Sequence, residues 1–143
     1  MSLTATIAAS DVQNAAFDLL AANAAFFTTA LGERFYTDVP QGTVFPQAWL
    51  TFEGDLESPN GTFGRCGAIV HLTLHIYSTY EGDAEALGIM KQATEIFNAG
   101  LSVSGWSTPW INRSMTPTWA VEDFNGIALR HGRKPFDVYV LAN

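Results

Sequence analysis

The chain has little cysteine and little positive charge. Its 143 residues include one cysteine, Cys66, and 7 basic against 14 acidic side chains, which gives a net charge of −7. A single cysteine cannot form an intramolecular disulfide, so a disulfide-stapled secreted scaffold is excluded. The acidic balance lacks the basic footprint of a general nucleic-acid binder. It suits a protein that repels DNA or meets a basic partner.

Long apolar runs and targeting signals are also missing. No run approaches the roughly 18 apolar residues that a membrane helix needs. The first residues, MSLTATIAASDVQ, lack the basic segment and continuous apolar core of a signal peptide. We therefore expect no membrane partner and synthesis in a reducing cytoplasm. An apolar content of 48% with 15% charged residues indicates a globular chain, and the length predicts one domain, residues 1–143.

Hydrophobic periodicity predicts two helical regions. Ser10 followed by Gln13 has the form of a capping box and is expected to open the first helix. This helix either continues to Gly32, a suitable stop, or breaks near Asn23, which would cap a second short turn. Asp83 is expected to cap a second, amphipathic helix over about 83–101.

Period-two alternation and turn residues predict the strands. The expected strands are residues 33–38, 49–57, 69–79, around 102–106, 118–121, and, after an Asn125-Gly126 turn, 127–130 and 136–141. The order of helix, strands, helix and strands predicts an α+β fold. It consists of a mainly antiparallel sheet with the N-terminal helix and the second amphipathic helix packed on one face.

No constellation of polar residues predicts catalysis or metal binding. His71 and His75 share a face of one predicted strand but lie roughly 13 Å apart along it, too far to share a metal, so half-exposed strand histidines are favoured. Cys66 lies beside Arg65 in a glycine-rich loop, yet nothing resembles a cysteine-nucleophile signature. Phosphate-binding glycine loops and nucleophile elbows are absent from the sequence. We expect no enzyme activity, no metal and no cofactor.

Three acids alternate along one predicted strand face: Glu53, Asp55 and Glu57. A solvated face is the favoured interpretation. The functional alternative is an acidic surface that DNA passes without sticking.

Two further groups are candidate contacts. Three tryptophans lie where secondary-structure signals are weak, and are either core cover or an interface patch. Three basic residues gather near the C-terminus, where they would pair with acids of a neighbouring subunit, touch a phosphate or form a solvated turn. These residues are Trp106, Trp110, Trp119, Arg130, Arg133 and Lys134.

Three ordered motifs resemble the phage tail-completion or tail-terminator family. The first is DVPQG at 38–42 followed by Phe45-Pro46 and a strand through Leu50. The second is the strand HLTLHIYS at 71–78 leading to EGDAEA at 81–86. The third is Arg130-His131-Gly132 before the last strand. The resemblance spans about residues 10–141 and adds Asp38, Val39, Pro40 and Gln41 as candidate contacts.

The resemblance implies a structural virion protein without catalysis. Such proteins form a ring, commonly a hexamer, that caps the tail tube, ends tube polymerisation and meets the connector or neck of the head. The implied partners are further copies of the chain, the tail tube protein and the neck protein, with DNA passing through the channel. The implied location is the tail end of the virion. A head-completion or neck adaptor on the portal side is the first alternative, and a small ligand-binding α+β domain is the second.

Overall fold

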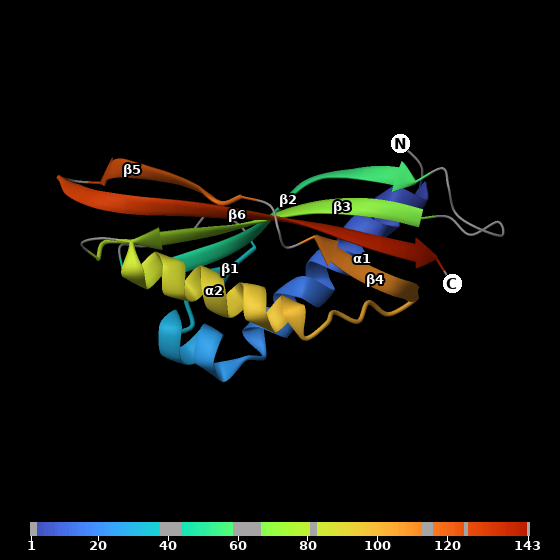
Figure 1. Cartoon of the computed structure of the whole chain (residues 1–143), viewed down its shortest axis with the longest axis horizontal. Helices are drawn as coiled ribbons and strands as arrows, with labels where there is room; N and C mark the ends of the chain where they lie inside the picture. Colours follow the sequence, from blue (N-terminus) through green and yellow to red (C-terminus); the bar gives the residue numbers. More distant parts are fainter. Residues whose placement is uncertain are drawn as a thin grey trace.

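A six-stranded sheet with helices against one face organises the chain (Figure 1). The computed structural model describes residues 3–37, 44–58, 67–80, 83–112, 116–124 and 126–142. Its elements are α1 (Leu3–Ala21), the π-helix η1 (Ala25–Ala30), β1 (Phe35–Tyr36), β2 (Gln47–Ser58), β3 (Gly67–Ser78), α2 (Ala84–Asn98), β4 (Trp106–Asn112), β5 (Thr118–Phe124) and β6 (Ile127–Ala142). The predicted α+β fold is confirmed.

The strands follow the order β1-β2-β3-β6-β4, and β5 also pairs with β6. Only β1 and β2 are parallel among the described pairs; the others are antiparallel. β6 pairs with β3 from Arg130 to Leu141. On its other edge it pairs first with β5 and then with β4, so these two strands follow each other along one edge.

The core lies between the sheet and the two helices. α1 packs on β2 and β3, and α2 packs on β3 and β6. Every second residue of β3 is buried at this face, and Phe97 of α2 meets Phe136 of β6 edge to face, with ring centroids 4.9 Å apart. Each aliphatic or aromatic side chain fully buried here contributes roughly 1.5–3 kcal/mol. No helix of the described residues covers the opposite face of the sheet (Figure 1), which we call the open face.

The N-terminal helix differs from prediction at its start. Ser10 lies exposed inside α1, which already begins at Leu3, so the predicted capping box is wrong. The alanines before Ser10 explain the longer helix, because alanine has the highest helix propensity. Of the two alternatives, the structure shows the break near Asn23: the Asn23 side chain accepts a hydrogen bond from the backbone N–H of Phe26 at 3.1 Å. Gly32 has φ +55° just past η1, as a stop residue should.

The predicted uninterrupted alternation over 49–57 is also wrong. The register of β2 on β3 shifts between Phe52 and Gly54, so Glu53 is the extra residue of a β-bulge. Before the bulge, Thr51 pairs with Thr73, which lies on the open face of β3. Past the bulge, Asp55 pairs with Val70, which is buried on the helical face. A one-residue shift exchanges the two faces of a strand. The three acids therefore do not follow a single alternating face.

The C-terminal strands are longer and differently bounded than predicted. The segment expected around 102–106 begins pairing only at Trp106. The runs at 127–130 and 136–141 are one strand, β6, although Gly132 and Pro135 lie between them. On the edge of β6 opposite β3, pairing with β5 extends only to Arg133, and pairing with β4 starts only at Asp137. Pro135 lies between these two paired stretches. The register thus leaves a gap in the pairing at Pro135, a place in a sheet where proline is tolerated.

Candidate functional site

The open face holds a chain of polar side chains that crosses four strands. His75 of β3 and His131 of β6 lie at its centre, with Nδ1 of His75 2.9 Å from Nε2 of His131. Both residues are buried, at 9% and 4% exposure. The expectation of half-exposed strand histidines is therefore wrong for His75. Aromatic rings shield the pair, since Tyr77 stacks on His131 at 4.2 Å and Trp49 lies against His75 at 4.8 Å.

A glutamate stands at each end of this chain. Nδ1 of His131 lies 3.1 Å from Oε1 of Glu122 on β5. At the other end, Nε2 of His75 lies 3.1 Å from the Thr51 hydroxyl and 3.6 Å from Oε1 of Glu53. Thr51 donates in turn to Glu53. We call these five residues (Glu53, Thr51, His75, His131 and Glu122) the histidine chain.

Burial keeps both central histidines neutral at neutral pH. Desolvation is the largest cause, and together with the charge of His131 it lowers the pKa of His75 to about 4, against the opposing pull of Glu53. Desolvation also lowers the pKa of His131, although Glu122 opposes it. The exposed Arg133 lowers both pKa values further through its charge. The chain is therefore uncharged at its centre and acidic at its ends.

His71 forms a separate pair on the same face. Its Nδ1 lies 2.6 Å from Oδ1 of Asp137 on β6, and its side chain is 41% exposed. This agrees with the predicted half-exposed strand histidine.

The three predicted tryptophan contacts lie in three different settings. Trp106 packs against the core and donates from Nε1 to Asp11 of α1 at 2.9 Å. Trp110 is 57% exposed beside Tyr139 on the open face. Trp119 lies over Gly132, where an added Cβ would meet its ring at 2.6 Å. The role of the three as contacts stays a prediction.

The basic residues of β6 do not form one cluster. Arg130 bonds Asp83 at the start of α2 at 3.3 Å. Asp83 is the N-cap residue of α2, as predicted, but its side chain pairs with Arg130 and makes no capping bond to the helix. Lys134 is buried, with Nζ 5.9 Å from the Phe136 ring centre, while Arg133 lies beside His131. Strand alternation thus places Arg133 on the opposite face from Arg130 and Lys134.

Several predicted site residues lie outside the described side chains. Residues 38–41 (Asp38, Val39, Pro40 and Gln41) and Cys66 lie outside the described residues. Asp55 and Glu57 are placed by their backbone register alone. Glu53 is described, and its side chain is 48% exposed.

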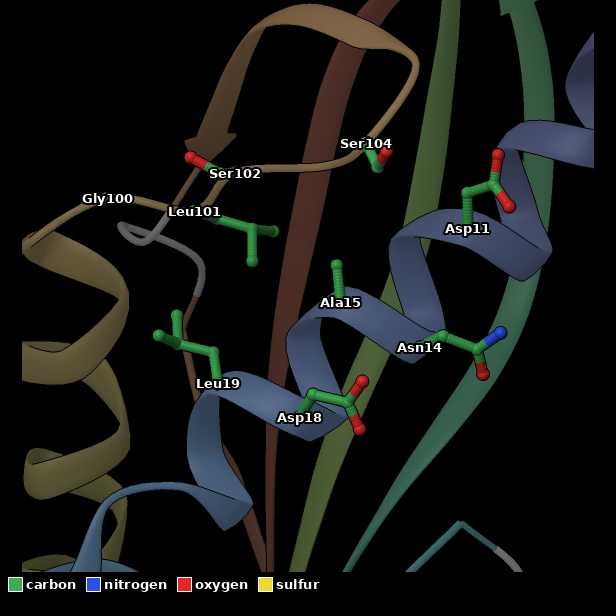
Figure 2. Close-up of a pocket in the computed structure, with 9 residues that line it drawn as sticks. All are labelled: Asp11, Asn14, Ala15, Asp18, Leu19, Gly100, Leu101, Ser102 and Ser104. Atoms are coloured by element: carbon green, nitrogen blue, oxygen red, sulfur yellow. The ribbon is translucent and has the colours of Figure 1, made fainter.

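A second feature is a groove on the helical side (Figure 2). It has a volume of about 620 Å³ and runs between α1 and the segment that follows α2. Asp11, Asn14 and Asp18 line it from α1, with Leu101 and Ser104 opposite. Its polar groups include no nucleophile with an adjacent base among the described residues.

Metal-binding clusters and membrane-spanning helices are absent from the residues that the structure describes. These ranges contain no group of three or more histidine, cysteine, aspartate or glutamate side chains able to hold a metal ion. No helix within them is long and apolar enough to span a bilayer.

The histidine chain was not predicted from the sequence because its residues are far apart along the chain. His75 and His131 are brought together by pairing β3 with β6 in one register, where Tyr77 faces His131. The available signal was an alternating strand with histidines at both 71 and 75, opposite a second strand that contains His131. Without the register, that signal cannot select the pair.

A mainly antiparallel sheet with helices packed on one face defines an α+β protein. The comparisons agree. The family model described as "Tail completion protein gp17" matches residues 14–108, more than half of the chain, and the chain therefore belongs to this family of structural, non-enzymatic proteins.

Solved structures show the same fold over the whole chain. A chain of the "Virion of native gene transfer agent (GTA) particle" superposes with a TM-score of 0.69 and 16% identity. The match covers 99% of this chain and 100% of the other. Comparison with curated protein sequences finds no significant match.

Proposed function

We propose that the chain caps the phage tail tube as a closed ring. There it ends tube polymerisation and provides the interface for head–tail joining. The observation that carries this proposal is membership of the tail completion family over residues 14–108. The fold shared with a virion chain along almost the whole length supports it. The active form would then be a hexamer or another closed ring, located at the tail end of the virion and assembled in the host cytoplasm.

The surfaces of the subunit suit assembly. β1 covers the outer edge of β2 only at Ala48 and Trp49 in the described part of the chain, and β5 is likewise an edge strand. Head-to-tail contacts between two different surfaces generate rings when the rotation closes. Exposed apolar side chains lie on strands of both sides of the sheet, including Phe52 on β2 and Val121 on β5. Covering them would favour association.

The acids of β2 are proposed to face the channel. The subunit carries a net charge of −7, and a ring multiplies that charge around one axis. A lumen with acidic walls repels the DNA phosphates, so DNA slides through without being held. Glu53, Asp55 and Glu57 are the candidates. Because of the bulge at Glu53, they do not all lie on the same face of β2.

Electron microscopy of tails assembled with and without this protein tests the proposal. We expect tails of unregulated length without it, and a ring at one end of length-limited tails with it. Normal tails in its absence would contradict a capping role. Binding to filled heads rather than to isolated tails would instead assign the protein to the portal side of the neck, as a head-completion adaptor.

A further inference from the structure

The histidine chain is one hydrogen short. It contains four consecutive polar contacts: Glu53 with Thr51, Thr51 with His75, His75 with His131, and His131 with Glu122. Each contact requires one hydrogen between its two heavy atoms. A hydroxyl supplies one, each neutral imidazole supplies one, and ionised carboxylates supply none. Three hydrogens therefore serve four contacts.

Arg133 determines which of the four contacts lacks a hydrogen. Its Nε donates to Nε2 of His131 at 3.5 Å. Nε2 is then an acceptor, and the hydrogen of His131 lies on Nδ1, where it is donated to Glu122. His75 in turn donates from Nδ1 to His131, so its Nε2 faces the Thr51 hydroxyl without a hydrogen. Because Thr51 donates its hydrogen to Glu53, the contact left without a hydrogen is the one between Thr51 and Nε2 of His75.

We propose that the histidine chain is a proton-binding site that takes up a single shared proton across the open face. With the proton on Nε2 of His75, that nitrogen donates to Thr51, and Thr51 donates to Glu53. All four contacts then contain a hydrogen, and the positive imidazolium lies between two carboxylates. No bond other than N–H is made, and the proton comes from solvent through the half-exposed Glu53.

The groups around the site set the pH at which it fills. Glu53 and Glu122 favour the proton, whereas burial and the charge of Arg133 oppose it. Tyr77, stacked on His131, stays neutral because burial raises its pKa. Uptake is therefore shifted to acid pH relative to a histidine in water.

Imidazole nitrogen NMR on the intact chain tests the proposal. We expect the signals of His75 and His131 to shift together, with one midpoint that accounts for one proton. Two independent steps that each take a proton would overturn the shared site.

A second measurement uses Glu53→Gln, because an amide can donate the missing hydrogen to Thr51. We expect its denaturation midpoint at pH 7 to be no lower than that of the parent chain. Asp137→Asn is the matched control: it weakens an ordinary histidine–carboxylate pair and should lower the midpoint. A fall in Glu53→Gln as large as that of the control would overturn the proposal.

Discussion

Gly132 shows how one residue positions a neighbouring side chain. The Trp119 ring lies so close that a Cβ at position 132 would be 2.6 Å from it. This distance is shorter than real Cβ contacts. Glycine at 132 therefore lets a large aromatic side chain lie flat on the β5–β6 ladder. The Arg-His-Gly step singled out in the sequence thus has a packing reason.

Gly132→Ala should destabilise the chain by roughly 1–3 kcal/mol, the range for forcing extra volume into a packed site. Trp119 would have to move, which its intrinsic fluorescence would report alongside the denaturation curve. Gly88→Ala is the control, because no atom lies within 4 Å of its added Cβ and it sits inside α2. That change should stabilise by about 0.5–1 kcal/mol. Equal effects of the two substitutions would contradict the packing argument.

At the scale of elements, the break between α1 and η1 depends on a side-chain cap. Asn23→Ala removes the acceptor of the Phe26 N–H bond and should cost about 1 kcal/mol. Thermal unfolding monitored by circular dichroism measures this. Asn14→Ala, on the exposed side of α1, should instead be neutral or stabilising by up to about 0.7 kcal/mol, since alanine is the better helix former. An unchanged melting temperature for Asn23→Ala would show that the cap contributes nothing.

Elements with a local signal were predicted well from the sequence. The alternation of β3, the periodicity of α2 and the break at Asn23 each depend on neighbouring residues. Three features were not predictable in this way. The bulge at Glu53 requires the partner strand, the continuity of β6 through Pro135 requires the gap between β5 and β4, and the His75–His131 contact requires the register. All three are properties of strand pairing between distant segments.

The stability of the whole molecule should fall in acid because of the open face. His75 has a pKa near 6.5 when unfolded and about 4 when folded. The unfolded chain therefore binds protons first, and the associated stability is complete above about pH 6.5 and is lost as the pH falls toward 4. One pKa unit corresponds to about 1.4 kcal/mol, so this residue can account for at most about 3 kcal/mol.

Urea denaturation at pH 7 and pH 4.5 measures this loss. His75→Gln should reduce the difference between the two pH values, whatever its effect on stability at pH 7. His71→Gln should leave most of the difference in place. A parent chain equally stable at both pH values would contradict the prediction.

For the assembled particle, the test of the channel acids is a charge reversal. Lysine at positions 53, 55 and 57 would place cations along the path of DNA, and attraction to phosphates should slow or stop ejection. The measurement is infectivity and DNA release from particles that electron microscopy shows to contain an intact ring. Unchanged infectivity with an intact ring would remove these residues from the channel wall.

The continuity of β6 has a mechanical consequence. Strand β6 runs the length of the molecule (Figure 1). It pairs with β3 on one edge and with β5 and β4 on the other. Tension applied along it acts in shear, so many hydrogen bonds must break together rather than one after another. A subunit pulled at its two ends would therefore extend very little before it unfolded. This strand would then carry most of the mechanical load across the subunit.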